Sequence, residues 1–181
     1  MELNYTLDEA DYLEHQLYDA SKSARIKKQR RQSWFFATLP FLSLCFLCYV
    51  TGHKAMMYAS AGVGILIFLF YPLYLKRFYY KHYQKYIADT CKNRFNEPCN
   101  IIFNEDSINS TDMSGEAKIN LSIIEEIAET GKYIYLKIKT GGHLIIPKLK
   151  LENVTLVQTN LAALADRLQI EYIKEPEWKW K

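Results

Sequence analysis

The sequence predicts an α+β membrane protein, in which a helical hairpin crosses the bilayer and a small antiparallel sheet lies outside it. Three observations predict this class. Residues 34–51 and 55–75 are apolar stretches without Asp, Glu, Lys, Arg or His. An amphipathic helical pattern precedes them. After Pro98 the pattern changes to the two-residue alternation that is typical of β-strands.

The two apolar stretches predict transmembrane helices over residues 34–51 and 55–75. Each approaches the roughly 20 residues that a helix needs to cross a bilayer. One continuous helix would place Lys54 at the centre of the bilayer, where a Lys costs about 3 kcal/mol. Gly52 permits a tight reversal instead, and His53 and Lys54 then reach water or headgroups. We therefore expect a hairpin over residues 34–75.

Basic residues flank this hairpin on the side of both chain ends. They are Lys22, Arg25, Lys27, Lys28, Arg30 and Arg31 before the first span, and Lys76, Arg77, Lys81, Lys85, Lys92 and Arg94 after the second. The tip has only Lys54. The positive-inside rule places both termini in the cytoplasm. Setting the topology is the simpler role of these residues, and recruitment of anionic lipid is the alternative.

Small residues recur in the second span, as Ala55 and Ala59 and as Ser60 and Gly64. Small residues at i and i+4 let two helix backbones approach closely. This face is expected to pack on the first span or on a second copy of the chain. Cys45 and Cys48 have the spacing of a redox motif, but they lie inside a predicted span, where a thiolate is poorly stabilised, so ordinary packing is expected. Cys91 and Cys99 match no zinc-ligand spacing, and we predict neither a metal site nor a cofactor.

Helices are also predicted on both sides of the hairpin. Thr6 and Glu9 have the spacing of a capping box, and an amphipathic pattern follows, which predicts a cytoplasmic helix within residues 1–33. Residues 76–97 are rich in Tyr and Lys and continue the second span outward. We interpret this segment as an interfacial linking helix, because alternating rings and cations are typical of the headgroup boundary.

A cytoplasmic domain of short strands and one helix is predicted for residues 98–174. In residues 132–148, apolar side chains alternate with Tyr and Lys, and Gly141-Gly142 offers a two-residue hairpin turn. Pro147 predicts an edge strand or a strand end, because proline lacks a donor for the ladder. An amphipathic helix after it can cover the open side of this meander. Residues 175–181 are expected to be a disordered tail.

These segments resemble the YcxB-like family of bacterial membrane proteins. The resemblance is carried by YTLDEADYLEHQLYDASKS near the start, by FNEDSI (103–108), and by the stretch from SIIEEIAETGKYIYL to IIPK (122–148). It implies a two-span hairpin with a YcxB-like domain in a bacterial cell membrane. It also implies a sheet-plus-helix domain similar to pleckstrin-homology-like modules. It brings no assigned activity and no catalytic residues.

The function predicted first is a membrane-anchored binding or regulatory module for a protein partner or a membrane component. The second is anionic-lipid recognition by an exposed basic and aromatic face formed by Tyr133, Tyr135, Lys137, Lys139, Lys148 and Lys150. The third is a small subunit of an oligomeric transporter. No constellation of acid, base and nucleophile favours an enzyme. The net charge of +3 is too small and too local to indicate a nucleic-acid binder.

Overall fold

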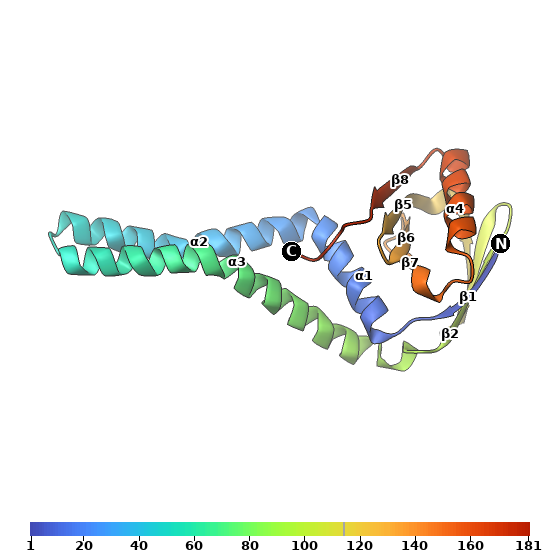
Figure 1. The fold of residues 1–181 in the computed structure, drawn as a ribbon, viewed down its shortest axis with the longest axis horizontal. Coiled ribbons are helices and arrows are strands. Elements are labelled where there is room, and N and C mark those ends of the chain that lie inside the picture. The colour runs from blue at the N-terminus through green and yellow to red at the C-terminus, as the bar shows by residue number, and fades with distance from the viewer. Residues whose placement is uncertain (114) are drawn as a thin grey trace. The chain divides into compact units, whose positions relative to one another are not determined.

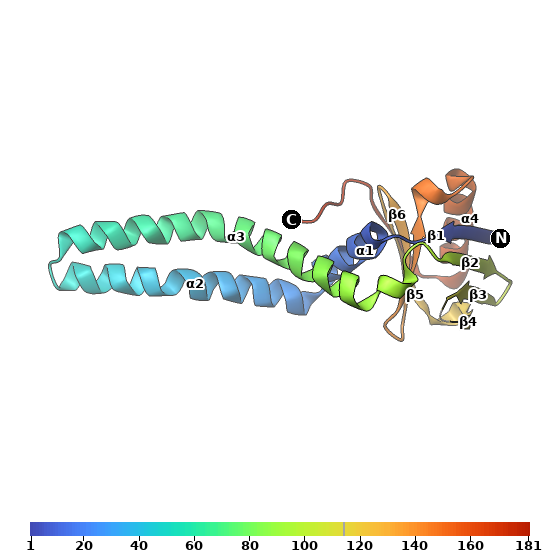
Figure 2. The same ribbon diagram turned by 90° about the horizontal axis from the view of Figure 1, so that it is seen from below.

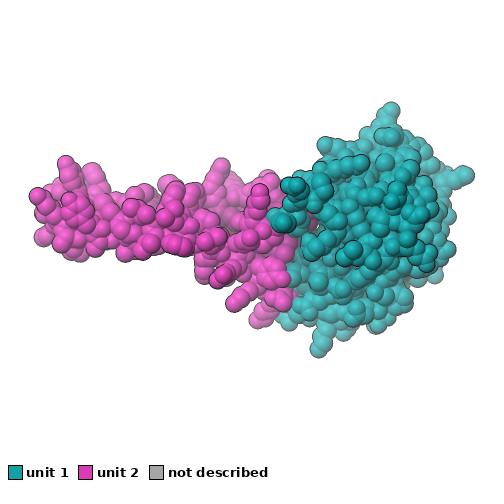
Figure 3. Space-filling model, viewed as in Figure 1, with its two compact units in different colours: residues 1–15, 86–179 teal, residues 16–85, 180–181 magenta. Residues whose placement is uncertain are grey.

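The computed structural model describes residues 1–113 and 115–181 and divides into two compact units. Unit 1 comprises residues 1–15 and 86–179, and unit 2 comprises residues 16–85 and 180–181 (Figure 3). Unit 1 holds the strands, and unit 2 holds most of two long apolar helices. The predicted α+β class with antiparallel strands is confirmed.

Two long helices, α2 (Ala24–Val50) and α3 (Lys54–Thr90), run side by side in unit 2 (Figures 1 and 2). A short turn joins them, and its Gly52 has a φ of 75°, a conformation that only glycine adopts without strain. The preceding helix α1 (Glu9–Lys22) is followed by Ser23, whose side chain caps the start of α2. The predicted reversal at Gly52 is confirmed.

Large apolar side chains are exposed along both helices. Phe36, Phe46 and Leu66 have exposed fractions of 65, 69 and 56%. Both helices are long and apolar enough to cross a membrane by length and composition. In water, side chains of this kind would be expected to form a buried core.

The two helices approach each other closely at Gly64. A Cβ atom at Gly64 would lie 3.2 Å from the Cβ of Phe41, so only glycine fits there without movement. Ser60 is buried on the same side, with 6% of its surface exposed. Ala55 and Ala59 are exposed and do not share this contact. Of the four predicted packing residues, two therefore belong to the hairpin interface, and packing of the other two on a second copy stays a prediction.

A proline inside α3 is compensated by a tryptophan on α2. Pro72 has no N–H, so the carbonyl of Phe68 lacks its helical donor. The Nε1–H of Trp34 donates to this carbonyl at 3.1 Å, and the Trp34 ring lies 4.6 Å from the Phe68 ring. In a bilayer, where no water can replace a missing donor, this bond stabilises the hairpin.

We expect Trp34→Phe to destabilise the hairpin by about 1 kcal/mol, because the ring is kept while the Phe68 carbonyl loses its donor. Unfolding of the full chain in mixed micelles measures this change. Trp178→Phe, in the segment after β8, is the matched control and should leave the hairpin unchanged. Equal stability of the Trp34 variant and the wild type would contradict this role of the indole.

The predicted disordered tail is wrong for its last residues. Trp180 is only 9% exposed, and its Nε1–H donates to the Lys76 carbonyl at 3.2 Å. The guanidinium of Arg30 lies 5.0 Å from the centre of the Trp180 ring and donates to the Lys181 carbonyl at 2.8 Å. Within unit 2, the indole is therefore held by both long helices.

The first sheet of unit 1 contains a strand that the sequence analysis missed. Its order is β1-β2-β3-β4, all antiparallel, and the strands are β1 (Glu2–Thr6), β2 (Pro98–Phe103), β3 (Ser107–Asp112) and β4 (Gly115–Asn120). Leu3 pairs with Ile101 across β1 and β2. The expected helix of residues 1–33 therefore begins only at Glu9, because the first residues gain a partner strand distant in sequence.

The second sheet has the order β7-β6-β5-β8. Its strands are β5 (Ile124–Thr130), β6 (Tyr133–Ile138), β7 (His143–Pro147) and β8 (Glu171–Glu175). Helix α4 (Val154–Leu168) precedes β8, which pairs parallel with β5. The predicted simple meander is therefore wrong, because α4 carries the chain back to the far edge of the sheet. Strand β7 is an edge strand that ends at Pro147, as predicted.

The β6–β7 hairpin is looser than predicted. Four residues rather than two separate β6 from β7, and Gly141 has a φ of 97°. Strand β6 is buried along almost its whole length, and α4 packs on β5 and β8. The core of this sheet contains Ile127, Ile134, Leu136, Ile146 and Leu161, all fully buried. Because β6 is buried on both faces, the tyrosine side chains that it carries lie in the interior, where they form part of the site described below.

Candidate functional site

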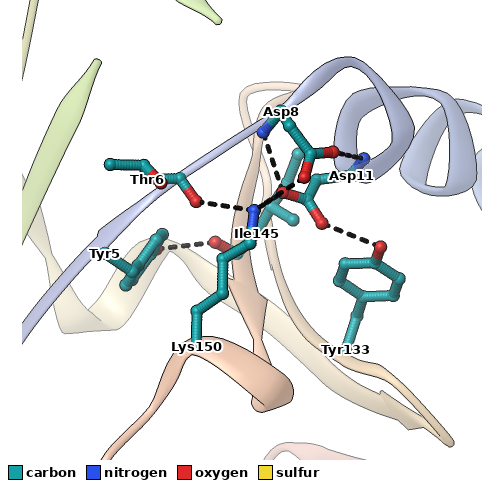
Figure 4. Close-up of polar contacts among 7 residues, drawn as sticks. All are labelled: Tyr5, Thr6, Asp8, Asp11, Tyr133, Ile145 and Lys150. Atoms are coloured by element: carbon teal, nitrogen blue, oxygen red, sulfur yellow. Dashed lines mark hydrogen bonds and ion pairs between the residues drawn. The ribbon is translucent and has the colours of Figure 1, made fainter. Parts of the chain in front are cut away.

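A partly buried polar cluster connects the start of the chain to the second sheet (Figure 4). Lys150 Nζ donates to Asp11 at 2.5 Å, to Asp8 at 2.9 Å and to the Thr6 carbonyl at 3.1 Å. The Tyr133 hydroxyl donates to the second Asp11 oxygen at 2.8 Å. We call Thr6, Asp8, Asp11, Tyr133 and Lys150 the Lys150 cluster.

Local sequence places the two acids of this cluster at the start of α1. The Asp8 N–H donates to the Asp11 carboxylate at 2.8 Å, and the Asp11 N–H donates to the Asp8 carboxylate at 3.0 Å. This reciprocal arrangement is a capping box, and it orients both carboxylates. The predicted box at Thr6 and Glu9 is wrong by two residues, because Thr6 is the last residue of β1.

Further contacts make this junction a firm connection within unit 1. The Tyr5 hydroxyl donates to the Ile145 carbonyl at 2.6 Å (Figure 4). The Lys150 amine comes from the 3-10 turn η3 (Lys148–Lys150), which directly follows β7. The residues that lead from β1 into α1 are therefore tied to β6, β7 and η3.

The charges of the cluster stabilise each other. Burial acts to raise the pKa of Asp8, but the hydrogen bond from Lys150 and the backbone donors lower it overall. Burial acts to lower the pKa of Lys150, and the bonds to Asp11 and Asp8 raise it overall. Burial and the bond to Asp11 raise the pKa of Tyr133 well above its usual range. Near neutral pH the amine and Asp8 are charged and Tyr133 is a hydrogen-bond donor.

A second buried cluster surrounds Glu129 on β5. Its carboxylate accepts from Gln158 at 2.6 Å, from the Tyr172 hydroxyl at 2.8 Å and from Lys148. Burial acts to raise the pKa of Glu129, and these donors lower it overall. Glu129 is not part of a solvated edge, because α4, β8 and η3 all contribute donors that enclose it. This cluster joins the elements of the second sheet.

A histidine without a hydrogen-bond partner at its buried Nε2 atom lies beside the Lys150 cluster. This residue, His15 of α1, contacts the Tyr135 ring at 5.3 Å and the His143 ring at 4.8 Å. Burial, with a smaller contribution from His143, lowers the pKa of His15 to about 3. His143, the first residue of β7, is therefore in contact with a largely buried ring and is not simply a solvated turn residue.

His15 should make the protein less stable in mild acid. Its ordinary pKa is about 6.5, so the unfolded chain binds a proton that the folded chain excludes, and stability falls as the pH drops from 6.5 towards 3. At pH 5 the loss is about 2 kcal/mol. His15→Phe should remove most of this dependence between pH 7 and 5 in denaturant unfolding of the full chain in micelles.

The exposed His82 supplies the matched control for this experiment. His82→Phe should keep the wild-type pH dependence. The window above pH 5 also separates His15 from Asp8 and Glu129, whose lowered pKa values affect stability only at lower pH. An unchanged slope in the His15 variant would contradict the exclusion of the proton.

The prediction of an exposed basic and aromatic face is wrong for its two tyrosines. Tyr133 and Tyr135 are 6% and 1% exposed, because β6 is covered on both sides. Lys148 and Lys150 lie in the two clusters described above. Lys137 forms an ion pair with Glu125 at 3.0 Å, and Lys139 donates to the Ser122 carbonyl at 2.9 Å. These six residues bind other parts of the same chain.

Asp8, Asp11 and His15 were not among the predicted site residues. Two acids at i and i+3 before an amphipathic helix could have predicted the cap, but nothing in the sequence indicated that Lys150 would meet them. Within residues 1–113 and 115–181, no group of three His, Cys, Asp or Glu side chains could hold a metal ion. The two clusters instead connect segments that are distant in sequence, and their opposite charges neutralise each other.

Comparison with known proteins gives one match. Residues 103–158, from the end of β2 into α4, match the family model described as YcxB-like protein. This confirms the resemblance for that part of the chain, including the FNEDSI stretch and residues 122–148. No curated protein and no solved structure matches the chain. Strands β1 and β8 and the acids of the Lys150 cluster lie outside the matched residues.

Proposed function

From the YcxB-like segment at residues 103–158, we propose that this chain is a membrane-anchored binding or regulatory module. The hairpin of α2 and α3 anchors it, and the strand-containing unit engages a protein partner or a membrane component in the cytoplasm. The observation that carries the proposal is the exposed apolar surface of α2 and α3, which a bilayer would cover. The resemblance extends the proposal to a bacterial cell membrane and to a pleckstrin-homology-like domain.

The Lys150 cluster adds a regulatory element to this proposal. Residues between β1 and α1 are tied to the second sheet, and the same chain segment continues through α1 into α2. A partner that alters the sheet would therefore act on the segment that leads into the hairpin. Recognition of lipid by the β6 face is less well supported, because its tyrosines are buried.

Membrane anchoring is tested by alkaline carbonate extraction and by cysteine labelling in intact cells. The full chain should stay in the membrane pellet. A membrane-impermeant maleimide should label a cysteine introduced as His53→Cys but not the native Cys91 and Cys99. Release into the supernatant would contradict anchoring, and labelling of Cys91 and Cys99 would contradict the orientation.

Engagement of a partner is tested by proximity labelling in native cells. The control is a chain that keeps residues 9–90 but carries an unrelated soluble domain in place of the strands. A control that simply ends at Asn96 is unsuitable, because β1 would lose its partner strand β2. A protein labelled only by the full chain supports the proposal and identifies the partner. Identical labelling by both chains contradicts it.

A further inference from the structure

A hollow of about 900 Å³ lies along α3 where this helix changes from apolar to basic. Its apolar part is lined by Phe70, Leu73 and Tyr74, and its basic part by Lys76, Arg77 and Lys81. Trp180 also lines it. All of these residues belong to unit 2.

The order of these side chains along the helix matches the layers of a membrane. Phe70 and Lys81 are separated by about 16 Å along the axis at 1.5 Å per residue. This is close to half of the hydrocarbon thickness of a bilayer, about 15 Å. With the apolar stretch of α3 in the bilayer, the apolar part faces acyl chains and the cations lie at the phosphate level.

The basic part of the hollow is not neutralised by the protein. Lys76, Arg77 and Lys81 are exposed, and in the part of the chain that the structure describes none of them has an ion-pair partner. No acidic side chain lines the hollow. This contrasts with Lys148 and Lys150, which are paired with carboxylates. Three unpaired cations beside an apolar wall fit a phosphate attached to an acyl chain.

Trp180 gives the hollow a fixed wall. Its Nε1–H is bonded to the Lys76 carbonyl, and its ring lies beneath the Arg30 guanidinium. The indole is therefore held by contacts on both sides and 9% exposed before any ligand arrives. A wall that is already ordered lowers the entropic cost of binding a ligand, because the indole itself need not be ordered.

We infer that this hollow binds an anionic phospholipid of the cytoplasmic leaflet. The acyl chain lies against Phe70, Leu73 and Tyr74, and the phosphate lies on Lys76, Arg77 and Lys81. The inference rests on the proposed membrane anchoring and adds a specific lipid site to it. The site is distinct from the β6 face, and its three cations belong to the flanking basic residues for which recruitment of anionic lipid was the alternative role.

The test titrates phosphatidylglycerol or phosphatidylcholine onto the detergent-solubilised full chain and counts bound lipid by native mass spectrometry. The wild type should prefer phosphatidylglycerol. Lys76→Gln/Arg77→Gln/Lys81→Gln should weaken its binding by about 100-fold, because each cation near an anionic headgroup contributes about fivefold. Inorganic phosphate should not displace the lipid, because it has no acyl chain.

The matched control removes the same charge from the other flank of the hairpin, as Lys27→Gln/Lys28→Gln/Arg31→Gln. These three exposed residues do not line the hollow, and their loss should leave the affinity within a few-fold of the wild type. Equal losses in both variants, equal binding of both lipids, or displacement by phosphate would overturn the inference. Carbonate extraction of the same chains separates this failure from a failure of anchoring.

Discussion

Lys150→Met is expected to destabilise unit 1 by about 3 kcal/mol, because it leaves the Asp11 carboxylate buried without its cation. The Asp11 side chain is 5% exposed, and Lys150 is the only cation among the described residues that pairs with it. The Tyr133 hydroxyl can still donate, but it carries no charge to compensate. Denaturant unfolding of the full chain in micelles measures the loss, and hydrogen exchange should accelerate in β1 and at the start of α1.

A surface ion pair of the same kind provides the control. Lys132 Nζ lies 3.1 Å from Glu14, with 61% of the Lys132 side chain exposed. Lys132→Met should therefore cost less than about 1 kcal/mol. Asp11→Asn in the Lys150→Met background should recover part of the stability, because it removes the uncompensated charge. Equal effects of the two Lys→Met changes would show that the Lys150 cluster is not a structural connection.

Leu161→Ala is expected to cost about 3 kcal/mol, the middle of the range for a leucine removed from a packed core. Leu161 is fully buried on the face of α4 that packs on the second sheet. Truncation leaves a cavity between α4 and the strands that it covers. The measurement is the free energy of unfolding of the full chain in micelles.

Leu156 on the same helix is 55% exposed and supplies the matched control. Leu156→Ala should change stability by less than about 0.5 kcal/mol, because it removes little buried surface. Comparable losses from the two substitutions would mean that α4 is not held to the sheet by its Leu161 face. Both variants replace a leucine of the same helix by alanine, so the difference in stability between them reports how deeply each leucine is buried.

Several features could be predicted because local residues determine them. The reversal at Gly52, the edge position of β7 and the amphipathic helix α4 each follow from patterns within a few residues. A glycine that can adopt a positive φ, a proline without a donor and apolar residues at helical spacing act on their own neighbours. The apolar stretches of α2 and α3 likewise required no knowledge of the rest of the chain.

The candidate site could not be predicted, because its residues come from distant parts of the chain. Alternation in residues 132–148 indicated one covered face, but elements on both sides of β6 bury Tyr133 and Tyr135 as well. Asp11 and Lys150 are 139 residues apart, and neither position alone distinguishes a buried ion pair from a solvated charge.

By itself, the sequence determined the hairpin, the strand-rich character of residues 98–174 and the YcxB-like resemblance of residues 103–158. Only the tertiary structure decided that residues 2–6 form a strand, that α4 leads into a parallel strand, and that Lys150 connects the start of α1 to the turn after β7. The physical reason is that helices and turns depend on neighbours in sequence. Sheet pairing and the burial of charge depend instead on partners brought together only by folding.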